Sequence, residues 1–223
     1  CNFEKGALNV RGAHVHNHVK FLRFPKDSQG RGRDDPNYDG RTLKVNDAQW
    51  KEVTNSDMTA AVKQWWDLKS QYFDTVLLFK TGKFYEMFHT DADIGVELLG
   101  FIYMKGKVAH AGFPEISYGQ FADKLVRAGY KVARVEQTET PDMLKQRKAN
   151  MPKSQKKPKV VNREVCSVMT LGTRTFCALD DSSALLAAEA SGGATDPCGP
   201  LLVVKEPMFE TEQGEKAHSE DED

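Results

Sequence analysis

The chain has 223 residues, with 31 Lys+Arg against 32 Asp+Glu, a formal net charge of −1 and a mean hydropathy of −0.56. This length allows one ordinary domain with extensions, or two small domains. No apolar run approaches the roughly 18 residues that a membrane-spanning helix needs, which excludes a membrane protein of that kind. The first residues, CNFEKGALNV, lack the apolar core of a signal peptide and do not begin with Met. We therefore expect a soluble chain that is a piece of a longer protein.

The net charge conceals an uneven distribution. Residues 145–163 contain eight Lys/Arg and no acid, whereas residues 206–223 contain eight acids and one Lys. Pro152 and Pro158 predict a solvated loop for the basic block, and such a loop can still contact phosphates. The acidic block is typical of a disordered, self-repelling tail. A net charge near zero therefore does not exclude a nucleic-acid partner.

Residues 1–57 are rich in turn formers and predict an extended lead-in without regular periodicity. Ser56 and Asp57 are candidate N-caps for a helix with an aromatic face. A strand buried on both faces is predicted at 75–80, and a short strand at 84–88 after the break at Gly82.

Asp91 and Asp93 open the next predicted helical turn, because acidic side chains favour a helix N-terminus. The apolar run 101–104 predicts a third strand. The clearest helix is the one capped by Ser117 and closed by Gly129, with its apolar residues on one stripe.

A further strand is predicted at 131–136, and Thr140 with Pro141 begins a helix that runs into the basic block. Residues 163–170 and 173–179 predict a hairpin. Alternation of strands and helices followed by a hairpin indicates an α+β fold, a mixed sheet with packed helices and flexible N- and C-terminal extensions.

This pattern divides the chain into a lead-in at 1–57, a folded domain at 58–180, and a disordered or truncated segment at 181–223. The alternating His14, His16 and His18 suggest a metal site if they lie on a strand. No Cys or carboxylate is placed to complete such a site, so a mobile polar segment without metal is the favoured alternative.

The sequence contains no catalytic pattern. There is no G-x-x-x-x-G-K-[ST] phosphate-binding loop, no G-x-S-x-G, and no Cys/His pair with the context of a nucleophile. We therefore expect no enzymatic activity in this chain.

The segment KTGKFYEMF at 80–88 is the most informative part of the sequence. On a strand, Phe84 and Glu86 point to the same face, so an aromatic ring and a carboxylate lie side by side. The ordinary alternative is a strand with Phe84 in the core and Glu86 at the edge, because Phe-x-Glu is common by chance.

TGKFYEMF resembles the Phe-x-Glu segment of the MutS family of DNA mismatch repair proteins. The resemblance covers roughly residues 31–180, and within the family the chain is most similar to the eukaryotic branch called MutS homologue six. Further matching runs, in chain order, are GRDDPNYDGRTL, WWDLKSQYFD, DADIGVELLG, MKGKVAHAGFPEISYGQFADKLVRAGYKVARVEQTETP and REVCSVMTLGTRT.

The resemblance implies a fold of the MutS N-terminal mismatch-recognition type and a role for particular residues. Phe84 would stack on a mispaired or unpaired base from the minor groove, and Glu86 would hydrogen-bond a ring nitrogen of that base. Lys83, Lys105 and Lys107 would hold the flanking DNA backbone. The loop that carries Lys105 and Lys107 departs in detail from the family pattern.

The resemblance also implies partners: duplex DNA with mismatches or small loops, and MutS homologue two as the heterodimer partner, in the nucleus. ATP and Mg²⁺ are cofactors of full-length members, whose ATPase lies beyond this chain, and none is expected here. A protein-interaction fragment without autonomous DNA binding is the main alternative. A nuclease is less favoured, because the sequence shows no metal cluster.

Overall fold

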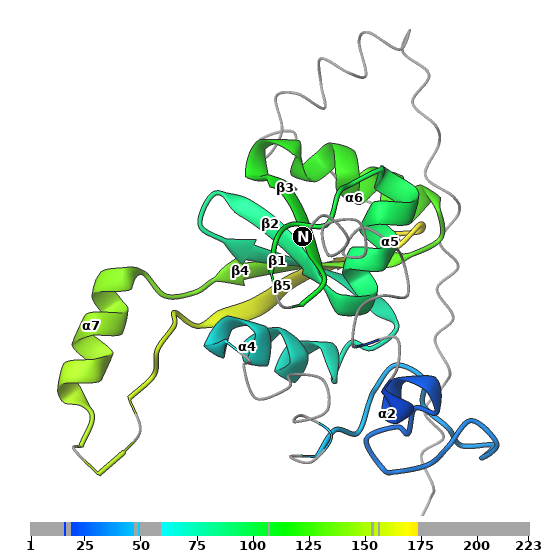
Figure 1. The fold of residues 1–223 in the computed structure, drawn as a ribbon, viewed down its shortest axis with the longest axis horizontal. Helices are drawn as coiled ribbons and strands as arrows, with labels where there is room; N and C mark the ends of the chain where they lie inside the picture. The colour runs from blue at the N-terminus through cyan, green and yellow to red at the C-terminus, as the bar shows by residue number, and fades with distance from the viewer. Residues whose placement is uncertain are drawn as a thin grey trace, which may run out of the picture.

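The computed structural model describes residues 16, 19–46, 49, 59–106, 108–152, 154–155 and 157–173. Their centre is one five-stranded sheet with the order β3-β2-β1-β4-β5 (Figure 1). β1 and β4 pair in parallel, and the other neighbours pair antiparallel. This mixed sheet with helices confirms the predicted α+β class. The strands are β1 (Thr75–Thr81), β2 (Phe84–Phe88), β3 (His110–Pro114), β4 (Lys131–Gln137) and β5 (Arg163–Met169).

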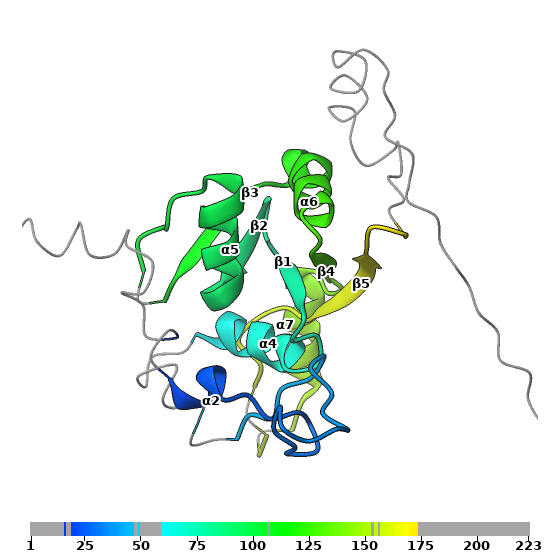
Figure 2. The ribbon, with the colours of Figure 1, turned by 90° about the vertical axis from the view of Figure 1, so that its right-hand side faces the viewer.

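Helices cover both faces of the sheet (Figure 2). α5 and α6 pack on one face, and α4 with the segment around α2 packs on the other. α7 follows β4 and stands apart from both layers (Figure 1). None of the described helices is long and apolar enough to cross a membrane. The helices are α2 (Lys20–Arg23), α4 (Ala60–Lys69), α5 (His89–Leu99), α6 (Tyr118–Arg127) and α7 (Pro141–Asn150).

The central strand β1 is buried on both sides, as its sequence predicts. Val76 and Leu78 belong to the core cluster beneath α5 and α6, whereas Leu77 and Phe79 belong to the cluster beneath α4. This alternation follows from the period of two in a strand.

The capping predictions have different outcomes. Thr140 is confirmed as a cap, because its hydroxyl accepts a hydrogen bond from the Met143 amide at 3.2 Å. The predicted start at Ser56 or Asp57 is wrong, since α4 begins at Ala60 and its N-cap is Thr59. Ser56 and Asp57 themselves lie outside the described residues.

The prediction of a strand at 101–104 is wrong. Phe101 and Tyr103 turn inward and Ile102 is 75% exposed, as in a strand. However, the Phe101 amide donates back to Gly95 O at 3.3 Å, and the Met104 amide donates to His110 O at 2.8 Å, so the segment does not form a ladder of strand pairs. β3 at His110–Pro114 takes the edge position instead. Its terminal proline is tolerated there because an edge strand has an unpaired side.

The helix predicted from Thr140 and Pro141 does run into the basic block, so the loop predicted for 145–163 is confined to the residues after this helix. α7 continues to Asn150, and β5 already begins at Arg163. For the predicted hairpin, the strand at 163–169 is confirmed, while residues 174–179 lie outside the described part of the chain.

The described part of the lead-in is mostly irregular but packs on the domain. Val19, Phe21 and Leu43 are buried in the cluster beneath α4. The Leu43 amide donates to Ser70 O at 2.8 Å, and the Phe73 amide donates to Arg41 O at 2.7 Å. The predicted domain boundaries stay a prediction.

Candidate functional site

A two-residue turn carries the candidate site. Thr81 at the end of β1 lies directly opposite Phe84 at the start of β2, so Gly82 and Lys83 form the whole turn. Gly82 has φ +60°, and Lys83 is not among the residues with positive φ. A positive φ at the first central position is the mark of a type II′ hairpin turn, which favours glycine there. The turn places Phe84 at the tip of the hairpin.

Phe84 is the one exposed residue of β2, whose other residues are buried or half-buried. Its side chain is 47% exposed, whereas Phe88, four residues further along the same face, is 5% exposed. Tyr85 and Met87 point to the opposite face and are buried there. Phe84 therefore does not belong to the core, which excludes the ordinary alternative for this residue.

Tyr85 fixes the tip from the opposite face of the sheet. Its ring lies between Phe113 and Tyr118, with centroids 5.9 and 5.0 Å away. The Tyr85 hydroxyl donates to Glu136 and accepts from Arg134 Nε at 2.9 Å. Burial, and then the carboxylate of Glu136, raise the pKa of Tyr85, so it stays a neutral donor. Phe84 is thus attached to a rigid base.

Arg163 is the fixed cation that faces Glu86. Its Nε donates to Lys80 O at 2.7 Å, and its guanidinium lies 4.9 Å from the ring centroid of Phe79, the residue opposite Glu86. Burial lowers the pKa of Arg163, and the charge of Glu86 acts in the opposite direction. The half-buried Glu86 carboxylate is therefore partly compensated while its strand remains at the surface.

The predicted lysines are not all in one place. Lys83 is exposed in the turn beside Phe84, and its carbonyl accepts from the Glu115 amide at 2.9 Å. Lys105 is exposed after Met104, whose amide bonds to His110, the residue opposite Phe88. Lys105 therefore lies next to the residue that is bonded opposite the end of β2, and it is not beside Phe84 at the start of that strand. Lys107 lies outside the described residues.

Ile116 is a neighbour of the tip that sequence reasoning missed. It follows Glu115 in a short 3-10 turn (Glu115–Ser117) and is 67% exposed. Lys80 also pairs with Glu115, which ties this turn to the hairpin. The only signal in the sequence is an isoleucine just after Pro114 and Glu115, and it becomes meaningful once Pro114 is known to lie opposite Phe84.

No group of three metal-ligating side chains occurs within the described residues. His16 is buried and its Nε2 lies 2.9 Å from Asp93 Oδ2, so the prediction of a mobile segment is wrong for this residue. His14 and His18 lie outside the described part of the chain.

A family model described as "MutS domain I" matches residues 59–176. The chain belongs to the MutS family.

Three relatives describe how far the similarity extends. The chain is 46% identical over 167 residues to the DNA mismatch repair protein Msh6 of Homo sapiens, and 49% identical over 163 residues to the probable Msh6 of Drosophila melanogaster. These matches cover 74% and 72% of the chain, but 12% and 13% of the relatives. The DNA mismatch repair protein MutS of Parabacteroides distasonis is 42% identical over 93 residues, 39% of the chain and 11% of that protein.

Proposed function

We propose that this chain is the mismatch-sensing module of a DNA mismatch repair protein. The observation that carries the proposal is the 47% exposed ring of Phe84 at the tip of a hairpin fixed from behind. A large aromatic side chain kept out of the core on a rigid strand is suited to a partner. Membership of the MutS family supports DNA as that partner.

A wedge of this kind tests deformability instead of sequence. The minor groove offers a degenerate pattern of donors and acceptors, so it specifies bases poorly. Inserting an apolar side chain unstacks a base step at a cost of a few kcal/mol, and a mismatched base has already lost part of its stacking. Smooth bending adds about 1–6 kcal/mol, again less where the duplex is flexible. Phe84 would thus convert local weakness of the duplex into binding.

Glu86 and Lys83 would complete the contact. A carboxylate repels phosphates, so Glu86 contributes only where a base supplies or shares a proton, which penalises intact DNA. Arg163, across Phe79 from Glu86, reduces that repulsion without leaving the sheet. Lys83, exposed in the turn, would contact a phosphate beside the probed base, and the exposed Lys105 would contact one further away.

We further propose that the module acts within a longer nuclear protein that pairs with MutS homologue two. The chain spans 12% of the human relative, so ATP, Mg²⁺ and the heterodimer contacts are assigned to regions outside the match. The matched part is MutS domain I alone, and the module would sense the defect without catalysing a reaction.

The direct test is fluorescence anisotropy of the 223-residue chain on a duplex with one G·T mismatch and on its matched counterpart. We expect tighter binding to the mismatched duplex. Phe84→Ala should reduce that affinity by about 5- to 150-fold, because stacking of a base on an aromatic side chain contributes about 1–3 kcal/mol. Folding should be almost unaffected, since the ring is not part of the core.

Phe24→Ala is the matched control. Phe24 is also an exposed phenylalanine, at 74%, but it is the C-cap of α2, which lies away from the turn between β1 and β2 (Figure 1). It should leave the mismatch preference unchanged. A preference that survives Phe84→Ala would disprove the wedge. Equal binding of the unaltered chain to both duplexes, or no binding at all, would favour the alternative of an interaction fragment without autonomous sensing.

A further inference from the structure

We propose that α7 and the basic loop after it form an arm that contacts the phosphate backbone of the same duplex that Phe84 probes. This arm, residues 138–162, deepens the proposed function, on which it rests. It contains α7 and most of the basic block, and it leaves the domain between β4 and β5.

The sheet topology brings the arm to the end that carries Phe84. Because β1 and β4 are parallel, both strands finish at the same end of the sheet. β2 starts there with Phe84, and β5 starts there with Arg163 opposite Gln137. The arm begins where β4 ends and returns where β5 begins. The wedge and the arm therefore share one end of the molecule, although they are more than 50 residues apart in sequence.

The arm is held at its base. Arg147 donates to both carboxylate oxygens of Glu139, at 2.7 and 2.6 Å, and to Asn162 Oδ1 at 3.2 Å. The Asn162 amide donates to Glu139 at 3.1 Å, and the Thr138 amide donates to Asn162 O at 3.1 Å. These bonds join the outgoing and returning chains. α7 is thus a helix with a fixed origin.

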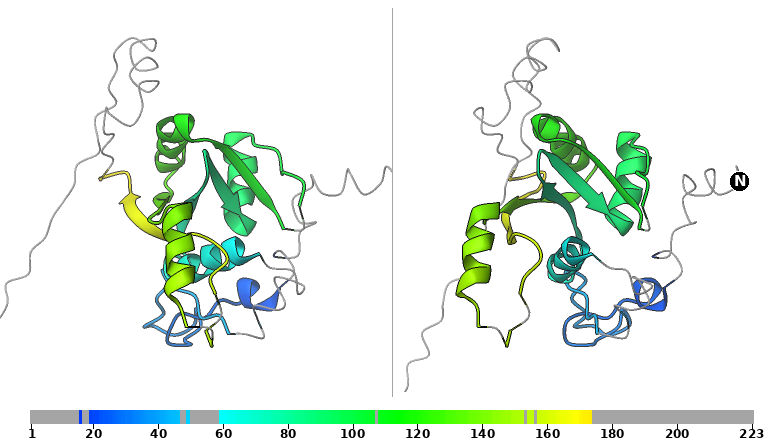
Figure 3. Two further views of the ribbon diagram at one scale, coloured as in Figure 1. Left: turned by 90° about the vertical axis from the view of Figure 1, so that its left-hand side faces the viewer. Right: turned by 60° about the vertical axis from the view of Figure 1, so that its left-hand side comes forward.

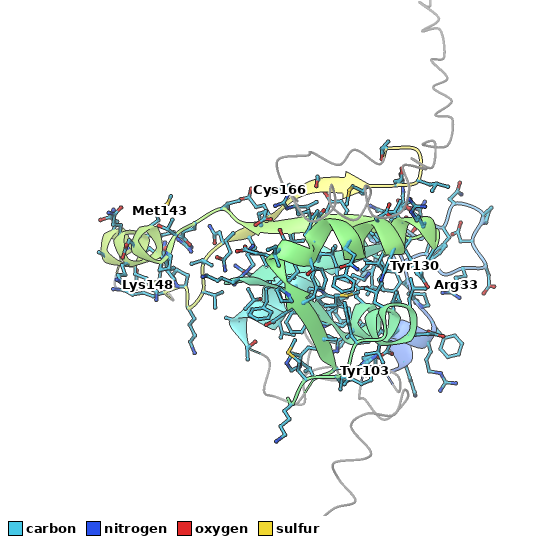
Figure 4. All side chains as sticks on the ribbon, turned by 90° about the horizontal axis from the view of Figure 1, so that it is seen from above. Arg33, Tyr103, Tyr130, Met143, Lys148 and Cys166 are labelled. Atoms are coloured by element: carbon cyan, nitrogen blue, oxygen red, sulfur yellow. The ribbon has the colours of Figure 1, made fainter. Side chains whose placement is uncertain are left out.

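Beyond its base, the arm makes little contact with the domain. Leu144 is the one side chain of α7 that is buried. Figure 4 shows Met143 and Lys148 well away from the packed side chains of the sheet and its helices. A helix that is polar on nearly all sides adds little to a core. Its conspicuous property is its charge.

That charge is positive and largely uncompensated. From residue 138 to 162 there are seven Lys/Arg and two acids. Glu139 is engaged by Arg147, and Asp142 pairs with Lys145 where both side chains are highly exposed, so this second pair contributes little. Among the described residues, Lys148, Lys157 and Lys159 form no ion pair.

The chemistry of the arm fits a duplex backbone. Lysines are flexible point charges that match phosphates without reading bases. B-DNA carries one negative charge per about 1.7 Å of its axis, so a duplex held at Phe84 presents many phosphates to a neighbouring basic arm. The arm would supply affinity common to all sequences, and Phe84 would supply the preference for a defect.

The test compares two triple variants of the 223-residue chain. One changes Lys148, Lys157 and Lys159 to Gln. The other changes Lys20, Lys26 and Lys44 to Gln. These three line a pocket beside α2, which lies across the domain from α7 (Figures 1 and 3). Anisotropy is measured on G·T and matched duplexes over a series of salt concentrations, and thermal unfolding verifies that each variant is folded.

The logarithm of the DNA-binding constant falls linearly with the logarithm of the salt concentration, and each lost phosphate contact makes this slope less steep by about 0.9. We expect the arm variant to lose up to about 2.7 in slope and to bind both duplexes more weakly by the same factor. The α2 variant should keep the original slope. An unchanged slope in the arm variant, or an equal loss in the α2 variant, would overturn the proposal.

The outcome is separable from that of the proposed function. Phe84→Ala should change the ratio between duplexes and leave the slope intact. A preference that survives Phe84→Ala, together with a reduced slope in the arm variant, would reject the wedge and retain the arm. An arm variant that loses only the mismatch preference would overturn the arm as a backbone contact.

Discussion

The hairpin tip and the arm lie at the same end of the sheet but are held in different ways. Phe84 extends from a strand whose next residue, Tyr85, is 1% exposed and fixed between two rings. The arm is fixed only at its base, by Glu139, Arg147 and Asn162. The difference matches the role that we propose for each region. Stacking on one base needs accurate placement, whereas attraction to phosphates needs only charge within reach.

The largest expected effect comes from a buried ion pair at the start of β1, the opposite end of that strand from the hairpin tip. Lys69 Nζ is buried 2.7 Å from Asp91 Oδ1 and also donates to Thr75 O, and Asp91 Oδ2 accepts from the Leu77 amide. Lys69→Met would leave Asp91 buried without its cation. We expect a loss of about 3–5 kcal/mol in the free energy of unfolding, measured with urea.

Lys145→Met is the matched control for this change. Lys145 belongs to the arm and is highly exposed, so its replacement should change the free energy of unfolding by no more than about 0.5 kcal/mol. Similar losses in the two variants would contradict the view that the buried pair in the domain and the exposed pair in the arm differ in how they are held.

A smaller expected effect, on the mismatch preference, tests the proposed role of Glu86 beside the tip. Glu86→Gln keeps an oxygen acceptor but removes the charge that repels phosphates. We expect matched duplex to bind more tightly and the mismatch preference to fall by about fivefold. That factor corresponds to about 1 kcal/mol, the difference between charged and neutral hydrogen bonds. Anisotropy on both duplexes measures it, and a preference that rises instead would exclude the proposed contact of Glu86 with the base.

The smallest expected effect is a loss of hydrogen-exchange protection at the base of the arm as the pH falls. Hydrogen bonds from Arg147 hold the pKa of Glu139 below its ordinary value, although burial opposes them. The stabilisation by the carboxylate is therefore complete above the ordinary glutamate pKa, and it is lost as pH falls through the lower value in the folded chain. We expect the hydrogen-exchange protection of the Asn162 amide to decrease over that range, while amides of the β1–β4 pair keep theirs.

Glu139→Gln supplies the control for this titration. Without the carboxylate, the protection of Asn162 should be low at neutral pH and should no longer change between neutral and acidic pH. A pH dependence that persists in the variant would show that another group controls the base of the arm.

Much of the fold is predictable from local patterns. The alternation in β1 and β2, the apolar stripe of α6 and the cap at Thr140 act over a few residues, and the structure contains all of them. Contacts between segments that are far apart in sequence could not be predicted. From the sequence, Asp91 and Asp93 are predicted only to favour the N-terminus of a helix. In the folded chain they are buried, and their partners include Lys69, 22 residues away, and His16, 77 residues away.

In the candidate site, too, local features are predictable from the sequence and contacts between distant segments are not. The pairing of Phe84 and Glu86 on one face follows from the strand alone, and their proposed roles came from the family resemblance. The exposure of Phe84, the position of Arg163 near Glu86 and the pairing of Pro114 with Phe84 depend on strand order. Lys105 could not be located from spacing, because the edge strand proved to be His110–Pro114 instead of residues 101–104.

The parallel pairing of β1 with β4 also determines when the tip can become rigid as the chain is made. The hairpin of β1 and β2 needs only residues 75–88, but β1 gains its second neighbour only when residues 131–137 are available. The aromatic rings of Phe113 and Tyr118, which hold Tyr85, are also synthesised after the hairpin. An isolated two-stranded hairpin is only marginally stable. The fixed placement of Phe84 is therefore a property of the completed sheet.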